Sequence, residues 1–142
     1  MGFPHKDNSN KNHAIKEYGM QKKSELFVMT KVKDLAKYVI NITEKSPKMF
    51  RFTLVVRLQN YCLDIIENVY FANLQKDIST RLNFQAKAKE LLSMLDYMSG
   101  LAYEQKCILF KQYEQISKQI AECLLYLNKW TASTKKSAST SE

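Results

Sequence analysis

Glycine, proline and histidine are scarce in this chain, and their scarcity excludes several classes of protein. Its 142 residues include 3 Gly and 2 Pro, which is too few for the turns and bulges of a sheet protein. No apolar run approaches the roughly 20 residues of a membrane span, and the first residues lack the pattern of a secretory leader. We therefore expect a soluble, cytoplasmic, all-helical protein, and the length suits a single folded domain.

The residues that usually carry catalysis or hold a metal are also missing or misplaced. His5 and His13 are the only histidines, and both lie in a polar N-terminal segment. Cys62, Cys107 and Cys123 are widely spaced and form no CxxC motif, which argues against a disulfide framework or a zinc site. Neither GxGxxG nor GxxxxGK[ST] is present, so a nucleotide-cradling loop is unsupported. We expect no enzyme, no cofactor and three cysteines that act as small hydrophobes.

Charge divides the chain into three parts. Residues 1–23 contain five Lys and two acidic residues, which predicts a flexible basic leader. Residues 24–132 contain 15 basic and 11 acidic residues and hold nearly all of the apolar pattern, so we expect the folded domain there. Residues 133–142 are mostly Ser, Thr and Lys, which predicts a disordered tail that buries nothing.

Four amphipathic patterns fill the middle of the chain, at about 25–44, 47–73, 77–104 and 110–131. In each pattern apolar residues recur three or four positions apart, which is the spacing of one helix face. Short links between helices of this length predict an up-and-down antiparallel four-helix bundle. The stripes used for the first, third and fourth helices are Val28, Val32, Leu35, Val39 and Ile42; Phe84, Ala88, Leu91, Leu95, Met98 and Ala102; and Tyr113, Ile116, Ile120, Cys123, Leu124, Leu127 and Trp130.

The second of these segments is more apolar than a bundle helix needs. We expect it to begin with Ser46 as N-cap and Pro47 as the first helical residue. Its apolar positions cover about half of the circumference, which favours a contact outside the bundle, such as a subunit interface. The alternative is a broad core within one chain. These positions are Leu54, Val55, Val56, Leu58, Cys62, Leu63, Ile65, Ile66, Val69 and Tyr70.

The basic residues from Lys48 to Lys129 are spread over the last three helical segments, which is typical of a solvated surface. The net charge of +8 nevertheless favours a polyanionic partner. Arg57 lies on the most apolar helix, where an unpaired guanidinium would be costly, and Asp64 is one candidate partner. No base-reading motif is present, so any nucleic-acid binding would use phosphate contacts.

Two segments resemble a bacterial family of four-helix bundles. The run SPKMFRFTLVVRLQN at 46–60 is similar to its PK-x-x-R-[FY]-x-L-x-x-R-[IL]-x-N signature. The run FKQYEQIS at 110–117 resembles the K-Q-Y-x-x-[IL]-S opening of its last helix, and Trp130 stands where relatives often have a closing Trp. The family contains the accessory variability determinants of diversity-generating retroelements and the proteins encoded in intervening sequences of 23S rRNA genes. Asn128 and Lys129 replace a Gly-Gly pair that relatives often carry.

The resemblance implies a homopentameric ring with a basic surface and no catalytic site. A retroelement member would bind its reverse transcriptase and its template RNA and cDNA, and would support mutagenic cDNA synthesis. Two alternatives stay open: a ribosomal-RNA-associated bundle without a polymerase partner, and a purely structural oligomer whose charge keeps it soluble. For Arg51, Arg57 and Arg81, intersubunit salt bridges are a competing role. The residues expected to contact nucleic acid or polymerase are Lys48, Arg51, Arg57, Arg81, Lys87, Lys89 and Lys111.

Overall fold

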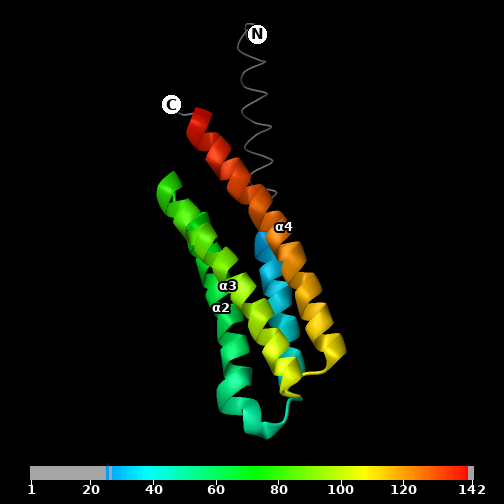
Figure 1. Cartoon of the computed structure of the whole chain (residues 1–142). Helices are drawn as coiled ribbons and strands as arrows, with labels where there is room; N and C mark the ends of the chain where they lie inside the picture. Colours follow the sequence, from blue (N-terminus) through cyan, green and yellow to red (C-terminus); the bar gives the residue numbers. More distant parts are fainter. Residues whose placement is uncertain (1–24, 26, 141–142) are drawn as a thin grey trace, which may run out of the picture.

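The chain forms an all-helical bundle. The computed structural model describes residue 25 and residues 27–140, so the predicted basic leader at 1–23 lies outside the described residues. Within that described part no strand is present, and the chain runs alternately up and down through four helices (Figure 1). The predicted all-α four-helix bundle is therefore confirmed.

The elements follow the predicted order with changes at their ends. The first helix covers residues 27–43. A 3₁₀ turn and a π-helix then lead into the second long helix, so the junction between them is not a regular α-helix. The later elements are η1 (Lys48–Phe50), η2 (Arg51–Val55), α2 (Val56–Leu74), α3 (Ile78–Glu104) and α4 (Phe110–Thr140).

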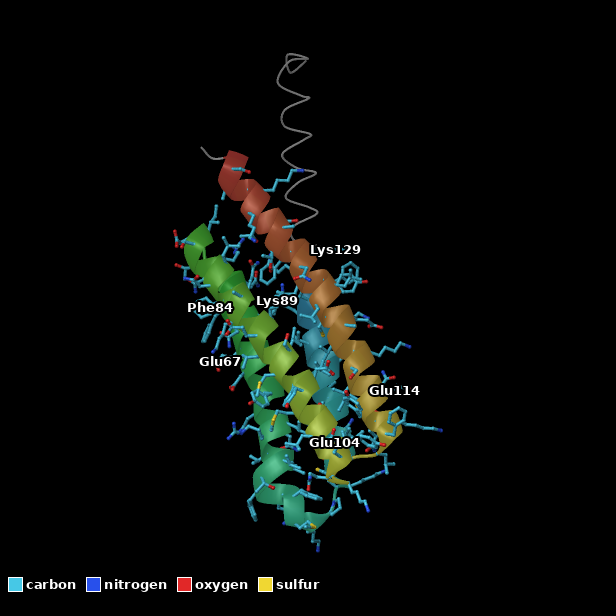
Figure 2. The ribbon with its side chains drawn as sticks, in the orientation of Figure 1. Glu67, Phe84, Lys89, Glu104, Glu114 and Lys129 are labelled. Atoms are coloured by element: carbon cyan, nitrogen blue, oxygen red, sulfur yellow. The ribbon has the colours of Figure 1, made fainter. Side chains whose placement is uncertain are left out.

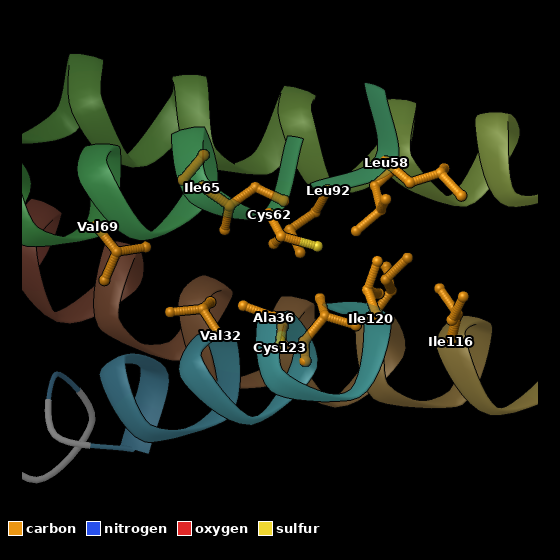
Figure 3. Packing of buried hydrophobic residues seen from close by; sticks show 14 of the residues in the cluster. Val32, Ala36, Leu58, Cys62, Ile65, Val69, Leu92, Ile116, Ile120 and Cys123 are labelled. Carbon is orange, nitrogen blue, oxygen red and sulfur yellow. The ribbon is translucent and has the colours of Figure 1, made fainter. Parts of the chain in front are cut away.

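All four helices bury one face in a common core. Figure 3 shows α2 residues such as Leu58 and Ile65 facing Val32 of the first helix and Ile120 of α4. The predicted stripes of the first helix and of α4 are largely confirmed, because their central residues are buried. Cys62, Cys107 and Cys123 are buried free thiols, as their sequence context indicates.

The core face of α3 is rotated from the predicted stripe. Ala88, Leu95 and Ala102 are buried as predicted. Gln85, Leu92 and Ser99 are also buried, whereas Phe84, Leu91 and Met98 are only partly buried. Ser99 Oγ donates to the Leu95 carbonyl at 2.7 Å, and Gln85 Nε2 donates to Thr134 Oγ1 at 3.1 Å. Hydrogen bonds of this kind lower the cost of burying polar groups. A pattern of apolar residues alone cannot reveal such positions.

The start of the second helical segment differs from the prediction. Pro47 is the N-cap of η1 rather than its first helical residue, with φ −54° and ψ 139°, and no side chain caps the turn. The predicted cap by Ser46 is therefore wrong. The Phe50 amide donates to the Pro47 carbonyl at 3.0 Å, and this short bond closes a 3₁₀ turn in place of an α-turn.

Helix α4 continues well beyond its predicted end. It reaches Thr140, so the prediction of a disordered tail from 133 is wrong for residues 133–140. Thr134 is buried and its Oγ1 donates to the Trp130 carbonyl at 3.0 Å. Hydroxyls that bond back to the preceding turn let Ser and Thr enter a helix, and Gln85 on α3 supplies a tertiary contact.

Polar contacts fix both ends of α3. Asp77 caps α3 through Oδ2, which accepts from the Thr80 hydroxyl at 2.7 Å and from the Thr80 amide at 3.0 Å. The hydroxyl bond, and after it the amide bond, lowers the pKa of the Asp77 carboxyl. At the other end of α3, Lys106 has φ 66°, and the Cys107 amide donates to the Ala102 carbonyl at 2.8 Å. This is the Schellman arrangement, in which glycine is the usual left-handed residue.

Candidate nucleic-acid interface

The most exposed apolar side chains in the described part lie beside two predicted contact residues. Phe52 is 85% exposed and Met49 is 79% exposed, and both lie in η1 and η2 with Lys48 and Arg51. We call Lys48, Met49, Arg51 and Phe52 the corner. It lies where the chain turns from the first helix into α2, at the bottom of Figure 1.

The local backbone places these side chains outward. Val55 is buried and Phe50 packs partly against the core, so these two residues anchor the segment. The π-helix Arg51–Val55, which follows Phe50 and ends at Val55, has a wider turn than an α-helix. Such turns are rare and frequently occur at functional sites.

A cavity of about 560 Å³ adjoins the corner. Lys48, Arg51 and Phe52 belong to its lining, and so does Glu44. Within residues 27–140 neither Lys48 nor Arg51 forms an ion pair. Unpaired cations beside an exposed aromatic ring form the combination that binds single-stranded nucleic acid, through phosphates and stacked bases.

Arg57 is solvent-exposed, which removes the reason to expect a buried partner. Its guanidinium carbon lies 6.0 Å from the centre of the Tyr61 ring, a cation–π contact at the outer limit of range. No ion pair with Asp64 forms in the described part of the chain. The candidate pair with Asp64 is therefore not formed within the chain, because one side of this apolar helix faces solvent, and a contact of Arg57 with another molecule stays a prediction.

Arg81 has a structural role that its sequence position did not reveal. Its Nε donates to the Ala72 carbonyl at 3.1 Å, and its Nη2 donates to the Gln75 carbonyl at 2.6 Å. These carbonyls lie at the end of α2, where the backbone leaves acceptors unsatisfied. Arg81 therefore caps α2 from the first turn of α3.

The remaining predicted contact residues do not join the corner. Lys87 lies 4.0 Å from Glu90 on the same helix, and Lys111 is exposed in the first turn of α4. Lys89 lies on the side of α3 that faces α4 (Figure 2) and lines a separate cavity. Of the seven residues, the structure brings together only Lys48 and Arg51.

A second exposed feature is an apolar stripe on α2. Residues seven apart on a helix differ by only about 20° in direction, and this spacing links Val56, Leu63 and Tyr70. Together with Leu74 they form what we call the outer stripe. All four are exposed, on the opposite side of α2 from the buried Leu58 and Ile65 that Figure 3 shows.

Helix α3 has a similar outward face, with Met94, Tyr97 and Leu101 exposed at helical spacing. The apolar surplus of the second segment is thus partly unpartnered in a single chain, as a contact outside the bundle requires.

Sequence analysis missed Met49 and Phe52. Phe52 lies one turn before Val56 on the same side of the helix, and that continuation of the stripe was the available signal.

No protein-family model and no curated protein matches the chain. Among the described residues, no helix is long and apolar enough to cross a membrane, and no group of three or more His, Cys, Asp or Glu residues could hold a metal ion.

Proposed function

We propose that this protein is a non-catalytic accessory subunit of a diversity-generating retroelement. It binds the template RNA and cDNA through the corner, docks on the reverse transcriptase, and supports mutagenic cDNA synthesis. The observation that carries the proposal is the exposed Phe52 ring beside Lys48 and Arg51. The link to a retroelement rests on the family resemblance of the segments 46–60 and 110–117.

Self-association is the second part of the proposal. A homopentameric ring would cover the outer stripe with the outward face of α3 in the next subunit, which is a head-to-tail contact that closes by rotation. The exposed apolar residues on both helices support such a contact. A ring would also repeat the corner five times. About ten phosphate contacts would then be available, and numbers of that order make affinity fall roughly 10³- to 10⁵-fold between 50 and 200 mM salt.

A purely structural oligomer is the competing function. The dispersal of Lys87, Lys89 and Lys111 and the capping role of Arg81 favour it. The two functions differ in one property, because only the accessory subunit uses Arg51 and Phe52 to bind RNA.

The first experiment measures the mass of the purified protein in solution, with and without a structured RNA, across a salt series. We expect an oligomer near five times 16.6 kDa that binds RNA at low salt and releases it at high salt. Leu63→Lys should dissociate the oligomer, because it introduces a charge into the outer stripe.

The second experiment compares variants on the same RNA. Arg51→Glu and Phe52→Ala should weaken binding at least tenfold, whereas the control Lys87→Glu should change it less than threefold. Equal losses for Arg51→Glu and Lys87→Glu would indicate diffuse electrostatics and reject the corner. An oligomer that ignores RNA at every salt concentration would leave the structural function. A reverse-transcriptase gene beside this gene, and pull-down of its product by the purified protein, would test the polymerase partner directly.

A further inference from the structure

A second cavity lies between the first half of α3 and the last third of α4. Its volume is about 470 Å³, within the range of small-molecule sites. Each helix contributes polar residues to the lining, including one lysine, Lys89 from α3 and Lys135 from α4. The lining consists of Leu82, Asn83, Gln85, Ala86 and Lys89 from α3, and Asn128, Thr131, Ala132 and Lys135 from α4.

Gln85 gives this cavity an unused hydrogen-bond acceptor. Its side chain is 1% exposed, and its Nε2 is committed to Thr134 Oγ1. Its Oε1 is buried and has no partner among the described residues. An orphaned buried acceptor costs free energy, and the terminal torsion of a glutamine is soft. A small rotation therefore lets Oε1 accept from a donor placed in the cavity.

Two lysines flank this acceptor. The hydrogen bond between Gln85 and Thr134 shows that these two residues lie side by side on the antiparallel helices α3 and α4. Lys89 lies four residues further along α3, about 6 Å along the axis, and Lys135 lies one residue beyond Thr134 in the opposite direction. Their long side chains can reach one anionic group or two adjacent ones. Neither lysine forms an ion pair within residues 27–140.

We propose that this cavity binds a nucleotide. The phosphate pairs with Lys89 and Lys135, and an N–H on the edge of the base donates to Gln85 Oε1. A simple phosphate ion is too small for this volume and does not span from the lysines to the buried acceptor. An acidic ligand without a donor would leave Gln85 unpaired. The cavity shares no residue with the corner, so nucleotide binding here does not depend on the proposed function.

The test titrates the full chain by calorimetry with the four nucleoside monophosphates, with the matching nucleosides and with inorganic phosphate. We expect at least one monophosphate to bind at least tenfold more tightly than both its nucleoside and inorganic phosphate. A short single-stranded RNA carrying a terminal phosphate then distinguishes the source of the ligand. Competition between this RNA and the monophosphate identifies the end of an RNA as a ligand, and its absence identifies a free nucleotide.

Three variants locate the site. Lys89→Gln and Lys135→Gln should each weaken monophosphate binding at least fivefold, and Gln85→Leu should reduce the preference of the nucleotide over inorganic phosphate. Lys87→Gln is the matched control, because Lys87 lies two residues from Lys89 on the same helix and outside the cavity lining. Thermal melting checks that each variant folds. Binding no tighter than that of phosphate, or equal losses in Lys89→Gln and Lys87→Gln, would overturn the proposal.

Discussion

The two faces of α2 are almost equally apolar but have opposite surroundings. On the inner face Ile65 is 1% exposed, and on the outer stripe Leu63 is 51% exposed. Two residues in the sequence separate a side chain that is buried in the core from one that is half exposed in the single chain. Composition therefore measures how much apolar surface a helix carries, whereas only the fold shows how much of it remains for a partner.

The largest expected effect separates these two faces directly. Ile65→Ala should lower the free energy of unfolding by about 2–5 kcal/mol, because it removes buried methyl groups and leaves a cavity. Leu63→Ala, measured at a dilution where the protein is monomeric, should change it by about 0.5 kcal/mol or less. Urea denaturation of both variants measures the difference. Similar losses would mean that the outer stripe is buried within one chain.

The next largest effect concerns the C-terminal end of α2. Arg81→Ala should cost about 1–3 kcal/mol, because it removes two charge-assisted hydrogen bonds to the carbonyls of Ala72 and Gln75. Arg57→Ala is the control, since Arg57 is exposed and its contact with the Tyr61 ring is at the outer limit of cation–π distances. It should cost no more than about 0.5–1 kcal/mol. Thermal melts of both variants measure these losses of stability. A larger loss for Arg57→Ala than for Arg81→Ala would contradict the capping role of Arg81.

Much of this fold was predictable, and the exceptions share a physical cause. The helix faces of Val28 and Ile116 follow from apolar spacing, since both residues are buried as predicted. The extension of α4 to Thr140 and the rotation of α3 depend on hydrogen bonds by Thr134 and Gln85. Polar residues that are buried by a partner on another helix leave no mark in a hydrophobic pattern.

The candidate sites were predictable in part for the same reason. A charge count favours an anionic partner but does not place the charges. Lys48 and Arg51 are close in sequence, so one turn brings them together. Arg81 has an equally suggestive position, but its guanidinium is used by the end of α2. Only the contacts of each cation distinguish these two cases.

A smaller effect tests whether the inner face of α2 excludes water. Burial raises the pKa of the Cys62 thiol to about 12, from an ordinary value near 9. The unfolded chain therefore loses this proton before the folded one, so stability is complete below about pH 9 and falls as pH rises toward 12. Burial raises the pKa of Cys123 in the same way.

Cys62→Ala removes one of the three buried thiols and should make the fall in stability shallower. Between pH 9.5 and 10.5 the slope of unfolding free energy should differ from that of the natural chain by about 1.4 kcal/mol per pH unit. Every other ionisable group is present in both proteins, so the difference between the two curves isolates the thiol. Parallel curves would show that Cys62 is reached by water.

The smallest expected effect is on a residue outside both faces of α2. It shows how much the free energy of unfolding changes when no core side chain is altered. Lys106 holds a left-handed conformation at the end of α3, with φ 66°, which costs a residue with a Cβ more than it costs glycine. Its amide and that of Cys107 already satisfy the last carbonyls of the helix, so the Schellman turn persists after substitution. Lys106→Gly should therefore raise the free energy of unfolding by about 0.5–1 kcal/mol. Lys111→Gly, in the first turn of α4, should instead lower it, and a loss in both variants would mean that the Lys106 side chain makes a contact that outweighs its backbone strain.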